Sequence, residues 1–280
     1  MPAFPFGEKL LACSVLIVLV CAAPTAGAAP QQGASAPDFF SSGVGWVGIG
    51  GDFIAVAGAR PPVTYDPAHP YVPNNTAKQP TFRIADLSNP NLKPWVKARM
   101  KKDNDEVLAG KIAFTPSSSC VPAGVPLFMG YGGPNPIVFL QTPKEVWIVF
   151  MSDQQIRRIY LDVLHSAHPK PSWYGESVGH YEGDTLVVDT IGMNDKTVVD
   201  VYRTPHTEKL HVVERWRMVD DGKAMEAVFT VEDPDTFYQP WTGMRHYRRA
   251  QQEHDEIVCA ENNTNNVFDY HVPKADKPDF

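Results

Sequence analysis

Hydrophobic and polar residues alternate with a period of two over much of the second half of the chain. Segments where this alternation, or a short β-branched and aromatic run, lies between turn residues are predicted to be β-strands. The predicted strands are 145–151, 157–161, 185–191, 209–219, 224–231 and 237–248. Asp220-Asp221-Gly222 is a hairpin signal, because Asp-Gly favours turns that match the strand twist. Strands joined this closely predict a mainly β fold, an antiparallel meander that closes into a barrel or a sandwich.

Prolines set the first half of the chain apart. Residues 61–143 contain fourteen of the 26 prolines, whereas residues 144–249 contain five. We therefore predict a proline-rich N-terminal wrap over 29–143, with one helix at about 90–109 that Gly110 could end. The predicted order is a signal peptide at 1–28, this wrap, an antiparallel β core at 144–272 and a C-terminal tail at 273–280, with wrap and core forming one domain.

The first thirty residues have the pattern of a secretory signal. Leu10–Ala23 is an apolar run without a charge, too short to span a bilayer but typical of a signal-peptide core. Ala26-Gly27-Ala28 has the small-x-small pattern of a cleavage site, so cleavage is predicted after Ala28. The alternative is a retained membrane anchor. We expect a periplasmic or secreted protein with no membrane segment after cleavage.

Export would leave two cysteines in the mature chain. Cys13 and Cys21 lie in the predicted signal peptide, so Cys120 and Cys259 remain. In an oxidising compartment two remaining cysteines most simply form one disulfide, and the alternative is two buried thiols.

Composition and charge narrow the class of protein. With 43% hydrophobic and 20% charged residues, the chain is neither a disordered polymer nor a coiled coil. Its net charge is −7 and it has no basic tail, so nucleic acid is an unlikely partner. The sequence carries no signal for the oligomeric state.

Two short motifs lack the context that their chemistry requires. Gly43–Gly48 matches the glycine pattern of a dinucleotide site, but a loop precedes it and a β-type run follows. Gly175–Gly179 matches the nucleophile elbow of serine hydrolases, but His168–Pro171 before it cannot be a central strand. We predict a glycine-rich first strand for the former and no serine nucleophile in the latter.

Several longer motifs resemble a family of exported bacterial proteins of unassigned function. The most specific is the sixteen-residue stretch Gly175–Thr190. The others are Ser119–Pro122, Arg157–Asp162, Glu214-Arg215, Glu232–Pro234, Pro240-Trp241 and Cys259–Asn263. His180 and Ala260 depart from the family pattern, which has arginine and histidine there. The resemblance implies export and a β architecture, and it brings no known activity.

Glu214 is the most informative acidic residue. In the predicted strand 209–219 the even positions form the apolar face, so Glu214 should point inward between Val212 and Trp216. A buried carboxylate must be paired, hydrogen-bonded or protonated, and desolvation raises its pKa towards the range of a general acid or base. The alternative is a structural ion pair, for which we considered Arg157, Arg158 and Arg245.

These residues define a candidate site for acid–base chemistry that needs no cofactor. Glu214 would be the general acid or base, Asp189 or Glu182 its partner, and Arg157 or Arg158 an anchor for an anion. Asp189 shares a strand face with Val187 and Ile191, which suggests that it too points inward.

A metal site has weaker support. His180 and Glu182 share one face of a short strand and could chelate a metal with a further histidine from the set His165, His168, His206, His246 and His254. The chain contains no recognised metal-binding motif, so no metal ligand is predicted. Glu182-Gly183-Asp184 is better explained as a hairpin turn.

The leading hypothesis is an exported β-domain that binds a small apolar or aromatic molecule in its interior, as a lyase, isomerase or hydratase type of enzyme or as a binding protein. The alternative is a non-catalytic envelope or secreted protein that acts through its surface loops. A cavity reached by Glu214 would support the first hypothesis, and an interior filled by side chains would support the second.

Overall fold

The computed structural model describes residues 36–40, 43–71, 83–111, 115–116, 120–130, 136–151 and 155–251, which belong to one compact unit. The described residues are mainly β, as predicted. The helices are α1 (Pro94–Leu108) and α2 (Leu127–Gly130). The strands are β1 (Trp46–Gly48), β2 (Ile54–Ala55), β3 (Ile137–Gln141), β4 (Glu145–Phe150), β5 (Gln155–Leu161), β6 (Glu176–Glu182), β7 (Thr185–Ile191), β8 (His211–Val219), β9 (Ala224–Glu232) and β10 (Trp241–Arg249).

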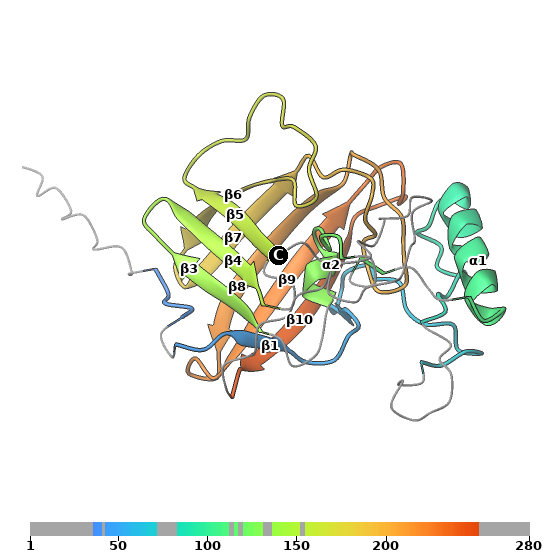
Figure 1. Ribbon diagram of the computed structural model, residues 1–280, viewed down its shortest axis with the longest axis horizontal. Helices are drawn as coiled ribbons and strands as arrows, with labels where there is room; N and C mark the ends of the chain where they lie inside the picture. The colour runs from blue at the N-terminus through green and yellow to red at the C-terminus, as the bar shows by residue number, and fades with distance from the viewer. Residues whose placement is uncertain are drawn as a thin grey trace, which may run out of the picture. The chain divides into compact units, whose positions relative to one another are not determined.

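Nine strands close into a barrel (Figure 1). Their order is β1-β3-β4-β5-β6-β7-β8-β9-β10, and β10 pairs back onto β1. Trp46 of β1 marks the closure, because it is paired with Ile137 of β3 and with Arg249 of β10. β2 pairs with β10 further along the same edge. The proline-rich stretch therefore supplies strands of the barrel itself, whereas the sequence predicted only a wrap around the core.

One pair of neighbouring strands departs from the predicted antiparallel meander. β5 and β6 run parallel, with Ile159 opposite Ser177 and Leu161 opposite Gly179. A parallel pair needs a long connection, and residues 162–175, here called the crossover loop, provide it. Alternation did not reveal this pairing, because a strand has the same period of two in parallel and antiparallel sheets.

Inward-facing aromatic side chains fill the barrel around α2. Trp46, Trp216 and Trp241 are each at most 2% exposed. The ring of Phe128 on α2 lies 6.2 Å from that of Trp216 on β8, and Phe139 of β3 contacts the same indole at 5.3 Å. All four residues of α2 are buried, so this short helix acts as a plug for the barrel.

Arg245 on β10 fixes the plug to the wall. Its guanidinium donates hydrogen bonds to the carbonyl oxygens of Met129 on α2, Gly50 and Asp52, at 2.8 to 2.9 Å. Burial lowers the pKa of this arginine. The sequence offered Arg245 as a possible partner of Glu214, but Arg245 instead binds backbone carbonyls, which carry the partial negative charge that it needs.

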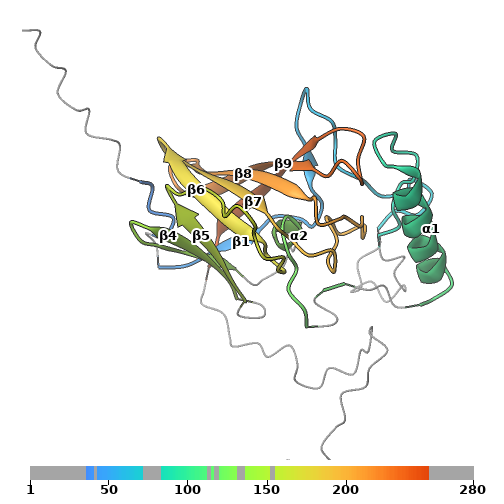
Figure 2. The same cartoon turned by 90° about the horizontal axis from the view of Figure 1, so that it is seen from above.

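The predicted helix over 90–109 is present as the shorter α1. The helix starts at Pro94, whose fixed φ suits a first helical position, and residues 90–93 form a turn in which Leu92 bridges to Phe237. Asn104 anchors the buried face through bonds of 3.0 Å to the backbone N–H and C=O of Ala85. Figure 2 shows α1 at the end of the molecule away from β4.

Two predicted turns are confirmed. Asp220, Asp221 and Gly222 all have positive φ and connect β8 to β9, and Gly183, with φ of 62°, connects β6 to β7. The predicted strand 185–191 is present with the same ends as β7, and the other predicted strands are present with shifted ends. The structure adds β2 and β3, which the sequence did not predict, and extends the short strand expected around His180 into β6.

Several predictions fall outside the described residues. These are the signal peptide 1–28, the residues Cys259, Ala260 and His254, and the tail 273–280. In the described part of the chain, no helix combines the length and apolar character needed to cross a membrane.

Candidate functional site

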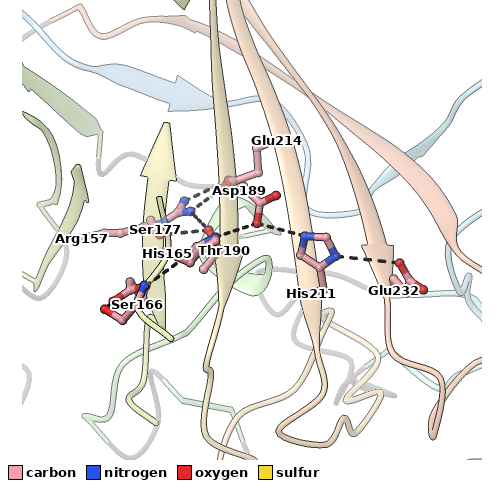
Figure 3. Close-up of polar contacts among 10 residues, drawn as sticks. Arg157, His165, Ser166, Ser177, Asp189, Thr190, His211, Glu214 and Glu232 are labelled. Atoms are coloured by element: carbon pink, nitrogen blue, oxygen red, sulfur yellow. Dashed lines mark hydrogen bonds and ion pairs between the residues drawn. The ribbon is translucent and has the colours of Figure 1, made fainter. Parts of the chain in front are cut away.

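Glu214 lies inside the barrel, as the alternation of β8 predicts. Its side chain is completely buried and forms a bidentate pair with Arg157 of β5, whose side chain is 2% exposed. Arg157 Nη1 donates to Glu214 Oε1 at 3.0 Å, and Nη2 donates to Oε2. The structural ion pair considered from the sequence is therefore present, and Arg157 is the partner (Figure 3).

Two hydroxyl groups complete the surroundings of Arg157. Its Nε donates to Ser177 Oγ on β6 at 3.2 Å, and its Nη2 donates to Thr190 Oγ1 on β7 at 2.8 Å. The two hydroxyls lie 3.0 Å apart, in residues that face each other across the β6–β7 ladder. We call Arg157, Ser177, Thr190 and Glu214 the inner cluster, which crosses four successive strands from β5 to β8.

The space around the inner cluster is filled by side chains. Arg157 lies over the ring of Phe128, 5.1 Å from its centroid, and Val188 and Phe229 flank Glu214 on the neighbouring strands. Tyr247 is buried beside them, and burial raises the pKa of its hydroxyl. Because Arg157 donates to both oxygens of Glu214, the geometry favours a fixed carboxylate. Burying such a pair is costly unless its remaining hydrogen bonds are satisfied, which Ser177 and Thr190 achieve.

Asp189 was predicted to point inward, and this prediction is wrong. Its side chain is 40% exposed on the outer face of β7, and the inward positions are Val188 and Thr190. Asp189 Oδ1 lies 3.0 Å from Nε2 of His165, in the crossover loop, and 3.0 Å from Nε2 of His211 on β8. Strand β7 is apolar on both faces, so its pattern could not identify the inner one.

The histidines extend this contact into a row of five titratable groups on four strands and the crossover loop. His165 Nδ1 lies 3.0 Å from Glu176 Oε1 of β6, and His211 Nδ1 lies 3.8 Å from Glu232 Oε2 of β9 (Figure 3). We call Glu176, His165, Asp189, His211 and Glu232 the outer cluster. Carboxylates and imidazoles alternate along it.

Hydrogen bonds shift the pKa values in the outer cluster. The bond from His211 lowers the pKa of Asp189, and the same bond raises the pKa of His211. The hydroxyl of Ser166 donates to Glu176 and lowers the pKa of that carboxyl. These bonds therefore favour the ionised forms of Asp189 and Glu176 and the protonated form of His211.

The remaining candidate residues are spread over the outer surface. Arg158 faces away from the interior and donates to both oxygens of Glu145, at 2.9 and 2.6 Å. Glu182 is half exposed and binds Arg215 at 2.6 Å and His180 at 3.1 Å. The structure thus brings Arg157 and Glu214 together inside the barrel and His180 and Glu182 together on its surface, and the predicted catalytic set does not converge on one site.

A pocket of about 590 Å³ lies where β5 and β6 separate. The β5–β6 ladder begins only at Ile159. Before Ile159, β5 is paired with β4 on one edge, and its other edge borders the pocket. Across the gap, Ser172 bridges in parallel to Met193, beyond the end of β7. Gly175 is required for this path, because φ is +65° and a Cβ would lie 2.3 Å from the Ile191 carbonyl oxygen.

The pocket wall combines aromatic, polar and charged side chains. Tyr160 comes from the outer face of β5, and Trp173 and Tyr174 come from the crossover loop. The other lining residues are Pro122, Gln155, Ile156, Arg158, Lys170, Ser172, Gly175, Glu176 and Ser177. Tyr174 is fixed by a hydrogen bond of 3.0 Å to Gln155 and by an edge contact with Phe128. Glu214 is not in the wall, but Ser177 connects the pocket to the inner cluster.

The predictions on metal and disulfide chemistry have different outcomes. No group of three metal-ligating side chains with suitable geometry occurs among the described residues. The alternative in which His180 and Glu182 bind a metal with another histidine therefore gains no support there. Cys259 lies outside the described residues, so its pairing with Cys120 stays a prediction.

The two motifs rejected as a serine-hydrolase site and a dinucleotide site lie at the start of strands, and not before a helix, as predicted. Gly175–Gly179 leads into strand β6, and Ser177 points inward to Arg157 instead of standing on a turn before a helix. Gly43–Gly48 leads into the short strand β1, and residues 49–71 contain no helix. Neither motif has the geometry on which its chemistry depends.

Sequence reasoning missed three features of the site. Thr190 had no signal, because the pattern of β7 did not identify its inner face, and Ser177 had none apart from the rejected nucleophile-elbow motif. His211 lies on the outward face of β8, as alternation shows, but its contact with Asp189 depends on the β7–β8 register. Tyr160, Trp173 and Tyr174 meet because of the parallel β5–β6 pair, which the pattern of residues did not indicate.

Comparison with family models, curated proteins and solved structures found no match to this chain.

Proposed function

We propose that this protein binds a small aromatic molecule in the pocket between β5 and the crossover loop. The observation that carries the proposal is the meeting of three aromatic side chains, Tyr160, Trp173 and Tyr174, around about 590 Å³ of space. That volume lies within the range of small-molecule sites, which is roughly 300–1,000 Å³. Aromatic walls favour flat rings, which they contact face to face or edge to face.

Charge in the pocket favours a ligand with an acidic group. Lys170 lines the pocket and forms no ion pair with the described residues. Arg158 contributes a second cation, shared with Glu145. Glu176 also lines the pocket, but its oxygens are already engaged by Ser166 and His165. A carboxylate on the ligand would complement the two cations.

The geometry supports binding more than acid–base catalysis. Both oxygens of Glu214 receive hydrogen bonds from Arg157, and side chains fill the space around them. A general acid or base must exchange a proton with the substrate at hydrogen-bond distance. We assign the inner cluster a different role: it holds Ser177, and with it the floor of the pocket, in one position.

The proposed setting is the periplasm or the exterior of the cell. The predicted signal peptide supports this setting, and the predicted disulfide between Cys120 and Cys259 fits an oxidising compartment. The ligand would then be a molecule that the protein meets outside the cytoplasm.

The proposal can be tested with simple aromatic acids. Benzoate, salicylate and indole acetate are titrated into the protein by calorimetry, with cyclohexanecarboxylate and phenol as the non-aromatic and uncharged comparisons. We expect at least one aromatic acid to bind, and Trp173→Ala to weaken it about tenfold, equivalent to about 1.4 kcal/mol. Trp95→Ala, on α1, is the matched control and should leave the affinity unchanged.

Two outcomes would contradict the proposal. One is the absence of binding by every aromatic acid in the set. The other is binding that Trp173→Ala and Trp95→Ala change equally, because the pocket would then not be the site.

A further inference from the structure

The crossover loop that forms one wall of the pocket is held at its start by the outer cluster. The backbone N–H of Asp162 donates to the carbonyl of Gly179 at 2.8 Å as the loop leaves β5. Three residues later His165 reaches both Glu176 and Asp189 at 3.0 Å, and the backbone N–H of Ser166 donates to Glu176 at 2.7 Å. Between this point and Ser172 the loop carries Lys170, a lining residue of the pocket.

We propose that Asp189 and His165, supported by His211, are positioning residues for the pocket and form a latch that, together with Ser166, holds the start of the crossover loop most firmly when the histidines are protonated. The inference rests on the proposed function and adds its regulation: affinity for an aromatic acid should fall as the pH rises above neutral.

The position of His165 between two carboxylates is the first argument. Its two ring nitrogens each lie 3.0 Å from a carboxylate oxygen, one of Glu176 and one of Asp189. A neutral imidazole carries one N–H, whereas an imidazolium carries two. Only the protonated ring can donate on both sides. Loss of that proton places a nitrogen lone pair against a carboxylate oxygen, which breaks one of the two contacts.

The charge of the whole cluster is the second argument. The groups that face His165 and His211 are Glu176 on β6, Asp189 on β7 and Glu232 on β9. With both imidazoles protonated, three carboxylates face two cations. With both neutral, the carboxylates face no cation within the cluster and repel one another. His211 contacts the same oxygen of Asp189 as His165 does. Protonation of His211 therefore also reduces the repulsion among the carboxylates of the cluster.

Glu176 connects the latch to the pocket. Its carboxylate receives the bonds from His165 and Ser166, and the same residue lines the pocket. The loop is held independently at its far end, where the Ser172 N–H donates to the Gly192 carbonyl at 3.0 Å. Release at His165 would leave Ser166 as the remaining contact with Glu176, so the part of the wall that carries Lys170 would be held less firmly while Trp173 and Tyr174 stay in place. The ligand would be held less well by Lys170 and would keep its aromatic contacts.

Amide hydrogen exchange of residues 163–171 tests the latch without any ligand. The exchange rates of β8 in the same protein serve as the reference for this segment. We expect protection of this segment to fall several-fold between about pH 6 and about pH 8.5, a range that spans the titration of histidine. In Asp189→Asn the segment should be less protected at the lower pH and show little change with pH. Glu226→Gln is the matched control, because Glu226 contacts Arg217 and His246 on the outer face of β9.

Ring nitrogen chemical shifts of His165 give a second readout. At about pH 6 both nitrogens should carry hydrogen, which a purely structural contact does not require. The latch is overturned if His165 is neutral there, or if Asp189→Asn and the unaltered protein have the same pH profile of exchange. Exchange needs no ligand, so this result is independent of whether aromatic acids bind. If they do, the affinity of benzoate should decrease with pH in the unaltered protein and not in Asp189→Asn.

Discussion

The inner and outer clusters occupy opposite faces of the same wall. Glu176 and Ser177 are adjacent in β6, and Asp189 and Thr190 are adjacent in β7. In each pair the first residue belongs to the outer cluster and the second to the inner cluster. The inner ion pair is at most 2% exposed, whereas the carboxylates of the outer cluster are 22% to 53% exposed. Neighbouring residues therefore experience very different solvation.

This difference determines what each cluster can do. Inside, one cation faces one anion and hydroxyl groups satisfy the remaining donors, because an unmatched charge in a dry interior is costly. Outside, water screens an unequal number of charges, so three carboxylates can share two histidines. The inner cluster suits a fixed structural role, and the outer cluster suits one that changes with pH.

The largest effect is expected from breaking the inner pair. Glu214→Ala leaves Arg157 buried without its counter-ion and should lower the free energy of unfolding by about 3–5 kcal/mol, measured by urea denaturation. The double variant Arg157→Met, Glu214→Leu removes both charges and should recover most of that loss. A single variant as stable as the unaltered protein would contradict the fixed role of the pair.

A smaller effect is expected when only one hydroxyl of the inner cluster is removed. Thr190→Val keeps the shape of the side chain and removes one of the two acceptors of Arg157 Nη2, which should cost about 1–3 kcal/mol of unfolding free energy. Thr242→Val, on the outer part of β10, is the comparison, because its partly exposed hydroxyl has a single hydrogen bond within the described part of the chain, to Thr230 at 3.1 Å. Equal losses in the two variants would show that the inner hydroxyl has no special role.

The smallest effect, and the one that depends on pH, is expected at the outer cluster. Asp189→Asn should cost about 0.5–1 kcal/mol of unfolding free energy, less in concentrated salt, because the side chain is partly exposed. The pKa of His211 is raised above 6.5 in the folded protein. The contribution of His211 to the free energy of unfolding is therefore complete below pH 6.5 and is lost as the pH rises through the raised pKa. The pKa of Asp189 is lowered below 3.8, so its contribution is present above pH 3.8 and is lost on further acidification.

Urea denaturation of Asp189→Asn and the unaltered protein across this range measures that dependence. The difference in unfolding free energy should be greatest between pH 3.8 and 6.5 and should shrink at alkaline pH. A difference that is constant with pH would remove the distinction drawn between the clusters.

Prediction from the sequence succeeded where one strand face is clearly polar and failed where both are apolar. β8 alternates charged and apolar residues, which placed Glu214 inside and allowed Arg157 as its partner. β7 reads Leu186-Val187-Val188 and gives no such contrast, which led to the wrong orientation for Asp189. The N-terminal wrap was only partly correct, because β1 gains its pairing partners from distant parts of the chain, with Trp46 opposite Arg249 of β10 and Ile137 of β3.

The sequence alone determined the β class, the main turns and the inward direction of Glu214, because these depend on backbone preferences and on the two-residue period of a strand. Only the tertiary structure decided that Arg157 is the partner of Glu214, that Asp189 bridges two histidines, and that Tyr160, Trp173 and Tyr174 line one pocket. Those contacts depend on strand order and register, and in particular on the parallel β5–β6 pair. Local sequence does not encode them, because they become favourable only when the barrel closes and buries its interior.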